Sequence, residues 1–403
     1  MKKWNVLLLV LLSIALHSCT EKDDVNPLNS GNNPPPTDTT RPIPADSLRL
    51  NQIQVIGSHN SYRIRTTDAI FNFLQSVKPL LTASGLNPDE LDYTHLPLPE
   101  QFSDYGIRQI ELDIFYDPDG GRFYNRGGNQ LVQLPVESGI PELNEPGFKV
   151  LHIPDVDYET HYFTFKQALQ AVKDWSETHP RHIPIFILIE TKETGLPVSI
   201  PFLNVAEVLP FDVNAMNAID EEIREVFGAE LEKVITPDDV RDTFPTLRDA
   251  ITKRGWPTLA ESRGKVIFLL NNGGTVKDNY LQGHPGLQGR ILFVNSGTDQ
   301  PESAFIMQNN PHDTRIELWV TQGFIVRTRA DDGTYEARTG DTSKRDRALA
   351  SGAQLISTDY YRPDPRYLTD TAWTDYQVSF AGYAPARLNP VSGPKNFDGG
   401  PLE

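Results

Sequence analysis

Four apolar, strand-like segments in the first half of the chain each run into residues that can do acid–base or metal chemistry. These residues are two histidines, three carboxylates, an amide and a lysine: His59, Asn60, Glu111, Asp113, His152, Glu190 and Lys192. Histidine exchanges protons near neutral pH, and grouped carboxylates hold a divalent cation. Together these residue types are sufficient for metal-assisted phosphoryl transfer.

Strand-like and helical segments alternate through the rest of the chain, which is typical of parallel βα units. The predicted strands are Ile53–Gly57, Gln109–Tyr116, Lys149–Ile153, Ile183–Glu190, Val266–Asn271, either Ile291–Asn295 or Ala304–Met307, Phe324–Thr328 and Gln354–Thr358. Eight such units in one domain predict an α/β fold, a (β/α)₈ barrel of the TIM type. The remaining length predicts long loops around its mouth, chiefly residues 63–105, 117–147 and 193–212.

Three segments between the strands show helical spacing. Phe165–Trp175 is one, and a second follows Asp212 as its N-cap. Gly228 would end that second helix, although Leu231 and Val234 fit a continuation. Lys344–Ala350 is the third, with Gly352 as its predicted C-terminal cap. A further set of apolar residues could form an amphipathic helix that covers the mouth: Phe71, Phe73, Leu74, Leu80 and Leu81. Burial of such a helix against the barrel is the commoner outcome.

Catalytic residues of a parallel barrel lie at the carboxyl ends of its strands, where the predicted histidines and carboxylates fall. Glu111 and Asp113 are two residues apart, so both side chains point to one face of their strand. Two carboxylates in a barrel mouth repel each other unless a cation pairs them. With Glu190 and the carbonyl oxygen of Asn60 they make an all-oxygen set, which favours Ca²⁺, with Mg²⁺ as the alternative, and disfavours Zn²⁺.

The order His-Asn, Glu-x-Asp, His, Glu resembles the calcium-dependent phosphatidylinositol-specific phospholipase C family, and its bacterial branch in particular. The resemblance extends from residue 50 to about residue 362. It includes three downstream segments: Trp256–Leu259 leading to Gly264–Leu270, Val326–Asp331, and Ser351–Tyr360.

The resemblance implies a role for each matching residue. Asn60, Glu111, Asp113 and Glu190 would ligate the Ca²⁺ ion. His59 would donate to a phosphate oxygen, and His152 would protonate the leaving alkoxide and later accept a proton from water. The ion would orient the inositol 2-hydroxyl for attack, and Glu111 is a candidate general base, so the products would be a cyclic inositol phosphate and diacylglycerol.

Three basic residues are candidates to hold the phosphate or the ring hydroxyls of such a substrate: Lys192, Arg327 and Arg329. Arg327 and Arg329 share one strand face, so both could reach the mouth. Surface ion pairs with the many nearby acids are the alternative role for these residues. Asp359 and Tyr360 lie at the end of the last strand, where a role in the site and a purely structural role are both open.

Two other functions remain open. A glycerophosphodiester phosphodiesterase also uses His, Glu-x-Asp, His and Glu-x-Lys, which Glu190-Thr191-Lys192 fits. That family usually shows His-Arg-Gly after the first strand and then Glu-Asn-Thr, whereas this chain has His59-Asn60-Ser61 and no nearby Glu-Asn-Thr. A non-catalytic surface lipoprotein that binds lipid or glycan on the same barrel is the third possibility.

The N-terminus predicts a lipoprotein signal. Lys2 and Lys3 precede the apolar run Val6–Leu12, which is too short to span a bilayer, and the only cysteine, Cys19, follows a loose lipobox. We therefore expect residues 1–18 to be a signal peptide, Cys19 to be lipidated, residues 19–47 to be a Pro-, Asn- and Thr-rich tether, and residues 48–403 to be the catalytic domain. The expected location is the bacterial outer membrane, with the anchor as the membrane contact.

The charge of the chain restricts its partners. A formal net charge of −17 argues against nucleic acid and against general attraction to an anionic bilayer. Basic residues near the site must therefore draw in an anionic phospholipid or small phosphodiester against the field of the whole protein. We expect the protein to be a monomer.

Overall fold

The computed structural model describes residues 41–197 and 203–403. The predicted signal peptide, the Cys19 lipidation site and most of the predicted tether lie outside the described residues. The last residues of that tether contact the folded domain, because Ile43 forms a bridge with Phe397 and Arg263 Nε donates to Asp46 Oδ1 at 2.7 Å. Within the described ranges, no helix has the length and apolar character needed to cross a membrane.

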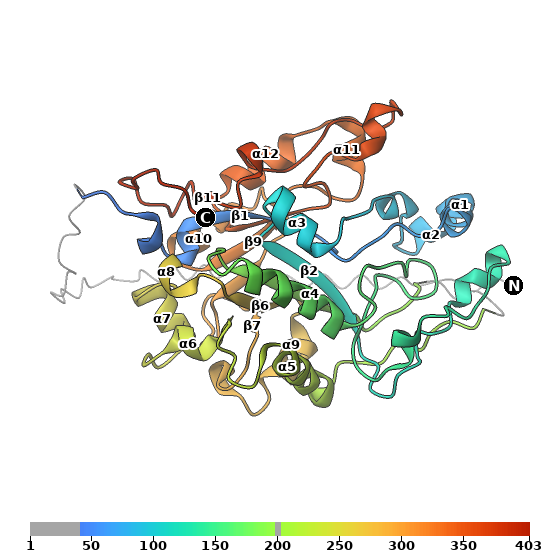
Figure 1. Ribbon diagram of the computed structural model, residues 1–403, viewed down its shortest axis with the longest axis horizontal. Helices are drawn as coiled ribbons and strands as arrows, with labels where there is room; N and C mark the ends of the chain where they lie inside the picture. Colours follow the sequence, from blue (N-terminus) through green and yellow to red (C-terminus); the bar gives the residue numbers. More distant parts are fainter. Residues whose placement is uncertain (1–40, 198–202) are drawn as a thin grey trace, which may run out of the picture. The chain divides into compact units, whose positions relative to one another are not determined.

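A strongly curled parallel sheet lies at the centre of the domain (Figure 1). In the described part of the chain its eight parallel barrel strands are β1 (Ile53–Ser58), β2 (Gln109–Phe115), β4 (Ile185–Thr191), β6 (Val266–Leu270), β7 (Phe293–Val294), β8 (Phe305–Met307), β9 (Ile325–Arg329) and β10 (Leu355–Thr358). Pairing runs from β8 through β9, β10, β1, β2 and β4 to β6, and β7 pairs with β6. A single parallel bridge between Asn295 and Phe305 links the β7 and β8 edges. The predicted barrel is confirmed.

One predicted barrel strand is wrong. The run at Lys149–Ile153 forms only the short β3 (Lys149–Val150), which pairs antiparallel with the end of β2. Between β2 and β3 the chain has only the short 3₁₀ turns η4 (Gly127–Val132) and η5 (Pro141–Asn144). Without a crossover helix the chain returns beside β2 in the opposite direction. The barrel still has its eight parallel strands, because both of the alternative segments, near residues 293 and 305, are strands.

Helices cover the outside of the barrel. Helix α4 (Phe165–Thr178) begins at a capping box, in which Thr164 Oγ1 accepts from the Gln167 amide at 3.2 Å. Helix α5 (Val213–Phe227) begins at Asp212, whose Oδ1 accepts from the Ala215 amide at 2.9 Å, as predicted. The predicted end at Gly228 is confirmed, since Gly228 is the C-cap at φ 91°. The alternative continuation is wrong, because Val234–Ile235 forms β5, parallel to β6.

The remaining elements complete the covering layer. They are α3 (Leu98–Tyr105), α6 (Pro237–Arg241), α7 (Leu247–Lys253), α8 (Leu259–Ser262), α9 (Gly274–Leu281), α10 (Arg315–Thr321), α11 (Tyr335–Thr339) and α12 (Ser343–Ala350). Ser351 is the C-cap of α12, and Gly352 follows it with a positive φ of 84°, the position that a helix-ending glycine usually takes. The short β11 (Arg387–Leu388) pairs antiparallel with β1. The core fills the space between strands and helices, and β6 is buried along its whole length.

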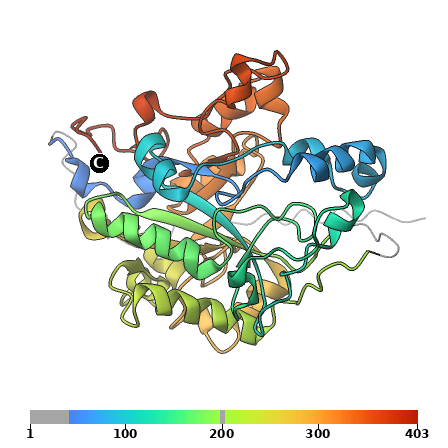
Figure 2. The ribbon, with the colours of Figure 1, turned by 45° about the vertical axis from the view of Figure 1, so that its right-hand side comes forward.

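The long segment after β1 forms a separate apolar cluster on the mouth side. It contains α1 (Asp68–Ser76), α2 (Lys78–Ala83) and the 3₁₀ turn η3 (Pro88–Leu91). Figure 2 shows these blue helices beside the loops that follow β2 and β3. Ile70, Leu74 and Leu81 pack with Val156 in a cluster distinct from the barrel core. The predicted amphipathic segment therefore packs against the mouth loops and not against the barrel wall.

Candidate active site and metal centre

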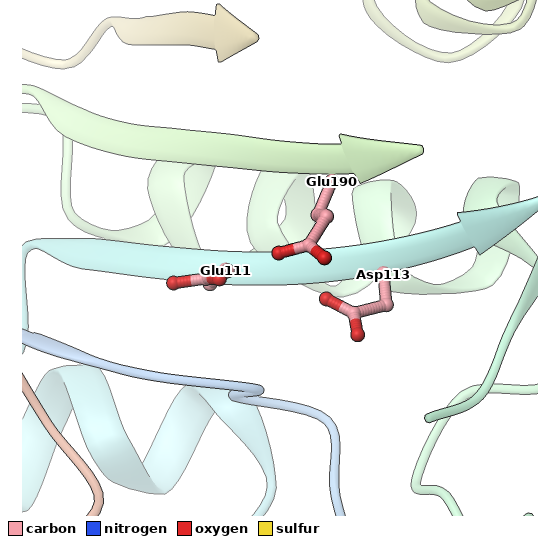
Figure 3. A group of neighbouring side chains, drawn as sticks. All are labelled: Glu111, Asp113 and Glu190. Atoms are coloured by element: carbon pink, nitrogen blue, oxygen red, sulfur yellow. The ribbon is translucent and has the colours of Figure 1, made fainter. Parts of the chain in front are cut away.

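Three carboxylates meet on β2 and β4, with Asp113 and Glu190 in the carboxyl-terminal halves of these strands and Glu111 farther back on β2. Asp113 is the register partner of Glu190 in the parallel pairing, so the two side chains point to the same face, and Glu111 lies two residues before Asp113. One oxygen of each carboxylate lies within 4.8 Å of the others. Figure 3 shows the three side chains gathered along these two strands. The predicted cluster is therefore assembled by the sheet register.

The turn after β1 places His59 and Asn60 beside this cluster. The turn is fixed to both neighbouring strands, because the His59 amide donates to Thr358 O at 2.9 Å and the Ser61 amide donates to Glu111 O at 3.0 Å. Asn60 adopts a left-handed φ of 47°, which asparagine tolerates better than most residues. Its Nδ2 donates to Tyr93 Oη at 3.3 Å, so its amide group is held in one orientation.

Two oxygens of the predicted ligand set are buried without any hydrogen-bond partner: Oδ1 of Asn60 and Oδ1 of Asp113. A buried oxygen without a partner costs free energy, and a bound cation would remove that cost. The donors are all hard oxygens, which suits Ca²⁺. The residues present therefore fit the expected metal.

Two cations already neutralise part of this negative charge. Lys192 Nζ lies 3.1 Å from Glu190 Oε1 and 3.3 Å from Asp113 Oδ2, and Arg327 Nη2 lies 2.6 Å from Glu111 Oε2. Burial raises the pKa of Asp113 well above its ordinary value, and Glu190 and Glu111 raise it further against the opposing effect of Lys192. Burial lowers the pKa of Lys192, but the Asp113 and Glu190 carboxylates more than offset this, so its pKa is raised.

His59 is oriented by Asp359 at the end of β10. Its Nδ1 lies 2.8 Å from Asp359 Oδ1, while Arg329 Nη2 donates to Asp359 Oδ2 at 2.8 Å. Burial would raise the pKa of Asp359, but His59 and Arg329 outweigh it and hold that pKa far below its usual range. Arg329 Nη1 also lies 3.4 Å from His59 Nε2. Asp359 therefore stays ionised and fixes the His59 ring with Nε2 toward Arg329.

His152 is oriented in the same way by a different carboxylate. Its Nδ1 lies 2.7 Å from Asp157 Oδ2. Arg63 donates to the same carboxylate from Nε at 2.9 Å and from Nη2 at 2.8 Å. The side chains of Arg63 and Asp157 are both 0% exposed. Burial lowers the pKa of His152, although Asp157 opposes the shift. Because β3 ends at Val150, His152 stands on a loop beside the barrel and not at the end of a barrel strand.

A cavity of about 300 Å³ opens above these groups. Its lining includes six of the residues that the sequence singled out: His59, Asn60, His152, Lys192, Arg329 and Asp359. Arg327 does not line it; this side chain is 1% exposed and lies deeper, against Glu111 and Ser357 Oγ. Of the two arginines on β9, only Arg329 is placed to touch a ligand in this cavity.

Sequence reasoning missed three residues that orient the site: Arg63, Tyr93 and Asp157. Asp157 lies five residues after His152, on an irregular loop, so no periodic pattern marks it. Arg63 and Tyr93 reach the site from the long segment after β1, whose course depends on tertiary packing. Asp359 was noted with two open roles, and the structure places it against His59.

The model of the Ca²⁺-dependent phosphoinositide phospholipase C family matches residues 48–390. A comparison with curated proteins finds no match. Similar solved structures include a calcium-dependent phosphoinositol-specific phospholipase C from Pseudomonas sp., with 18% identity, a TM-score of 0.49, and coverage of 86% of this chain and 98% of that one.

A Ca²⁺-dependent phosphatidylinositol-specific phospholipase C from Streptomyces antibioticus has 15% identity and a TM-score of 0.46, over 78% of this chain and 95% of that one. The phosphatidylinositol-specific phospholipase C of Listeria monocytogenes has 11% identity and a TM-score of 0.39, over 79% and 91%.

Proposed function

Because the chain belongs to the Ca²⁺-dependent phosphoinositide phospholipase C family, we propose that it cleaves phosphatidylinositol through two carboxylate-oriented histidines to give diacylglycerol and a cyclic inositol phosphate. One observation carries the proposal: His59 and His152, each held by a buried aspartate, face one cavity beside a cluster of three carboxylates. Neither the glycerophosphodiester phosphodiesterase nor the non-catalytic lipoprotein is favoured by the family match.

The proton transfers follow from the orientation of the two rings. Asp157 accepts from Nδ1–H of His152, so Nε2 is the atom left to give a proton to the departing glycerol oxygen. In a second step the same nitrogen takes a proton from water that opens the cyclic phosphate. Arg329 would donate to the phosphate oxygens, and so would Nε2 of His59 when its ring carries both protons, where negative charge grows in the transition state.

The Ca²⁺ of the family would be held by Asn60, Glu111, Asp113 and Glu190. When bound there, the ion would supply charge stabilisation and lower the pKa of the attacking hydroxyl. Glu111 is our candidate for the base that removes the hydroxyl proton, since its Oε1 lies 3.8 Å from His59 Nε2, close to where the phosphate would be held. Lys192, which lines the same cavity, is our candidate to contact the ring hydroxyls or the phosphate.

Phosphorus NMR of phosphatidylinositol micelles, with and without Ca²⁺, tests the proposal. We expect a cyclic phosphate signal that disappears with a chelator and in His59→Ala, and that persists in His312→Ala, a matched change at an exposed histidine. Release of glycerol 3-phosphate from glycerophosphodiesters, without any cyclic product, would replace this proposal with the rival phosphodiesterase.

We also propose that Cys19 carries a lipid anchor that holds a monomeric enzyme on the outer membrane. The support is the sequence alone: the short apolar run, the lipobox-like Leu16–Cys19 and the polar tether after it. Mass spectrometry of the mature N-terminus and fractionation of Cys19→Ser test the anchor, since the variant should leave the membrane fraction. Light scattering of the tail-less protein tests the monomer, and a dimer mass would contradict it.

A further inference from the structure

A second cavity lies beside the catalytic one and is almost entirely apolar. Its volume is about 430 Å³, within the usual range of ligand pockets. We call it the apolar groove and define it by Val77, Leu80, Leu81, Leu131, Val156 and Leu196. Ser84 is the one residue with a polar side chain in its described lining. Leu80 stands at the surface with 64% of its area exposed.

The apolar groove adjoins the catalytic cavity. Pro197 lines both. Leu86 and Leu91 line the catalytic cavity and pack in one cluster with Leu81 and Val156 of the groove. The partition between the two cavities is therefore itself apolar.

The groove lies on the side of the catalytic cavity from which the leaving group is protonated. Val156 lines the groove and is the neighbour of Asp157, the carboxylate that holds His152. Ile153, directly after His152, lines the catalytic cavity and packs against the same apolar cluster. One short loop, residues 152–157, thus carries the acid for the departing glycerol oxygen and one wall of the groove.

We infer that the apolar groove holds an acyl chain of the lipid substrate while its headgroup occupies the catalytic cavity. The inference rests on the proposed function, because the occupant is the glycerol side of the same phosphodiester. An inositol ring or a glycan needs hydrogen-bond partners for its hydroxyls, and the lining offers almost none. A hydrocarbon chain attached a few bonds from the oxygen that His152 protonates needs only apolar contact. The groove therefore selects phosphodiesters with a fatty acyl arm over water-soluble ones.

The test uses monomeric dibutanoyl-, dihexanoyl- and dioctanoyl-phosphatidylinositol, each below its micelle-forming concentration, so that no bilayer or micelle takes part. For the tail-less protein with Ca²⁺ we expect kcat/KM to rise about three- to fourfold for each methylene that enters the groove, the increment of methylene burial. Hydrolysis of a cyclic inositol phosphate, which has no chain, is measured in parallel.

Leu131→Asn and Val77→Asn place an amide in two separate half-buried parts of the lining. We expect either variant to flatten the chain-length dependence, so that the ratio of dioctanoyl to cyclic-phosphate turnover falls at least tenfold. Leu368→Asn is the matched control, because Leu368 is an exposed apolar residue (72%) outside the groove, on the segment after β10. This control should retain the wild-type dependence.

Three results would overturn the inference. The first is a kcat/KM that does not change with chain length for monomeric substrates. The second is unchanged turnover of the monomeric substrates by both groove variants, together with a loss of turnover on phosphatidylinositol vesicles that Leu368→Asn shares. That result would show that apolar residues insert into the bilayer and do not bind one chain. The third is no turnover of any substrate, including the cyclic phosphate, which would reject the proposed function together with the groove.

Discussion

Replacing Asp157 with Asn removes one negative charge beside His152 without changing the shape of the side chain. The ring nitrogen and the carboxylate oxygen are 2.7 Å apart, so the two charge centres are about 4 Å apart, which is worth about 4 kcal/mol at an effective dielectric constant of about 20. That interaction favours the protonated ring, so the pKa of His152, already lowered by burial, should fall further in the variant.

The direction of the effect on activity follows from the role of His152. A general acid must carry its proton, so activity falls as the pH rises through its pKa, on the basic limb of the profile. Asp157→Asn should move that limb to lower pH and reduce kcat/KM about 100-fold or more on its basic side. The assay is kcat/KM against pH on a water-soluble substrate with saturating Ca²⁺.

Stability gives a second readout of the same change. Arg63 is fully buried, and in the variant it keeps the backbone carbonyls of Tyr93 and Leu91 as acceptors but loses the opposing charge. Loss of one partner from a buried pair costs about 3–5 kcal/mol, so the thermal midpoint should drop by several degrees. Thermal unfolding followed by circular dichroism measures this loss directly.

Asp155→Asn is the matched control for Asp157→Asn. Asp155 is also buried and lies on the same loop, but it accepts from the backbone amides of Gly127 at 2.7 Å and Ala206 at 2.9 Å and has no histidine partner. The Asp155→Asn variant should have a lower thermal midpoint, and the basic limb of its pH profile should stay at the wild-type position. The reasoning is refuted if the limb stays fixed in Asp157→Asn, or if it moves equally in both variants.

Three further predictions concern the metal cluster and His59. Ca²⁺ at 100 times its dissociation constant should stabilise the protein by about 2.7 kcal/mol in thermal unfolding, and Asp113→Asn should abolish most of this gain; an unchanged gain would place the ion elsewhere. Lys192→Met removes the ammonium 3.1 Å from Glu190, so the calcium-free protein should melt earlier and gain more from Ca²⁺ than the wild type; equal gains would contradict the neutralising role. Asp359→Asn should lower kcat about 10- to 1,000-fold with little change in KM, because the His59 ring loses its orienting charge at 2.8 Å; steady-state kinetics with unaltered kcat would reject that role.

Several elements could be predicted from sequence because their signal is local. β1 and β4 are apolar runs that end in polar residues, β2 alternates apolar and acidic residues, and α5 begins at an N-cap that the sequence displays. The period-two spacing of Glu111 and Asp113 fixed their common face before any fold was known. The parallel register then brought Glu190 beside Asp113, as expected for strand ends that meet at one edge.

The prediction failed where the direction of the chain depends on what connects two elements. β3 looks like any other short apolar run, and only the lack of a crossover helix after β2 turns it antiparallel. Val234 fitted a continuation of α5 as the alternative to the stop at Gly228, but β6 offers an edge that Val234–Ile235 joins as β5. Glycine can mark where a helix ends, but the strand with which the following segment pairs has no mark in the sequence.

By itself, the sequence determined the chemistry that is present: two histidines, an all-oxygen set of ligands and the strand ends that carry most of them. Only the tertiary structure decided which groups orient that chemistry. The contacts that pair Arg63 with Asp157 and His59 with Asp359 join residues 94 and 300 positions apart in the chain. The apolar groove is likewise assembled from segments after four different strands. Contacts between residues at such separations depend on tertiary packing, and no local sequence pattern indicates them.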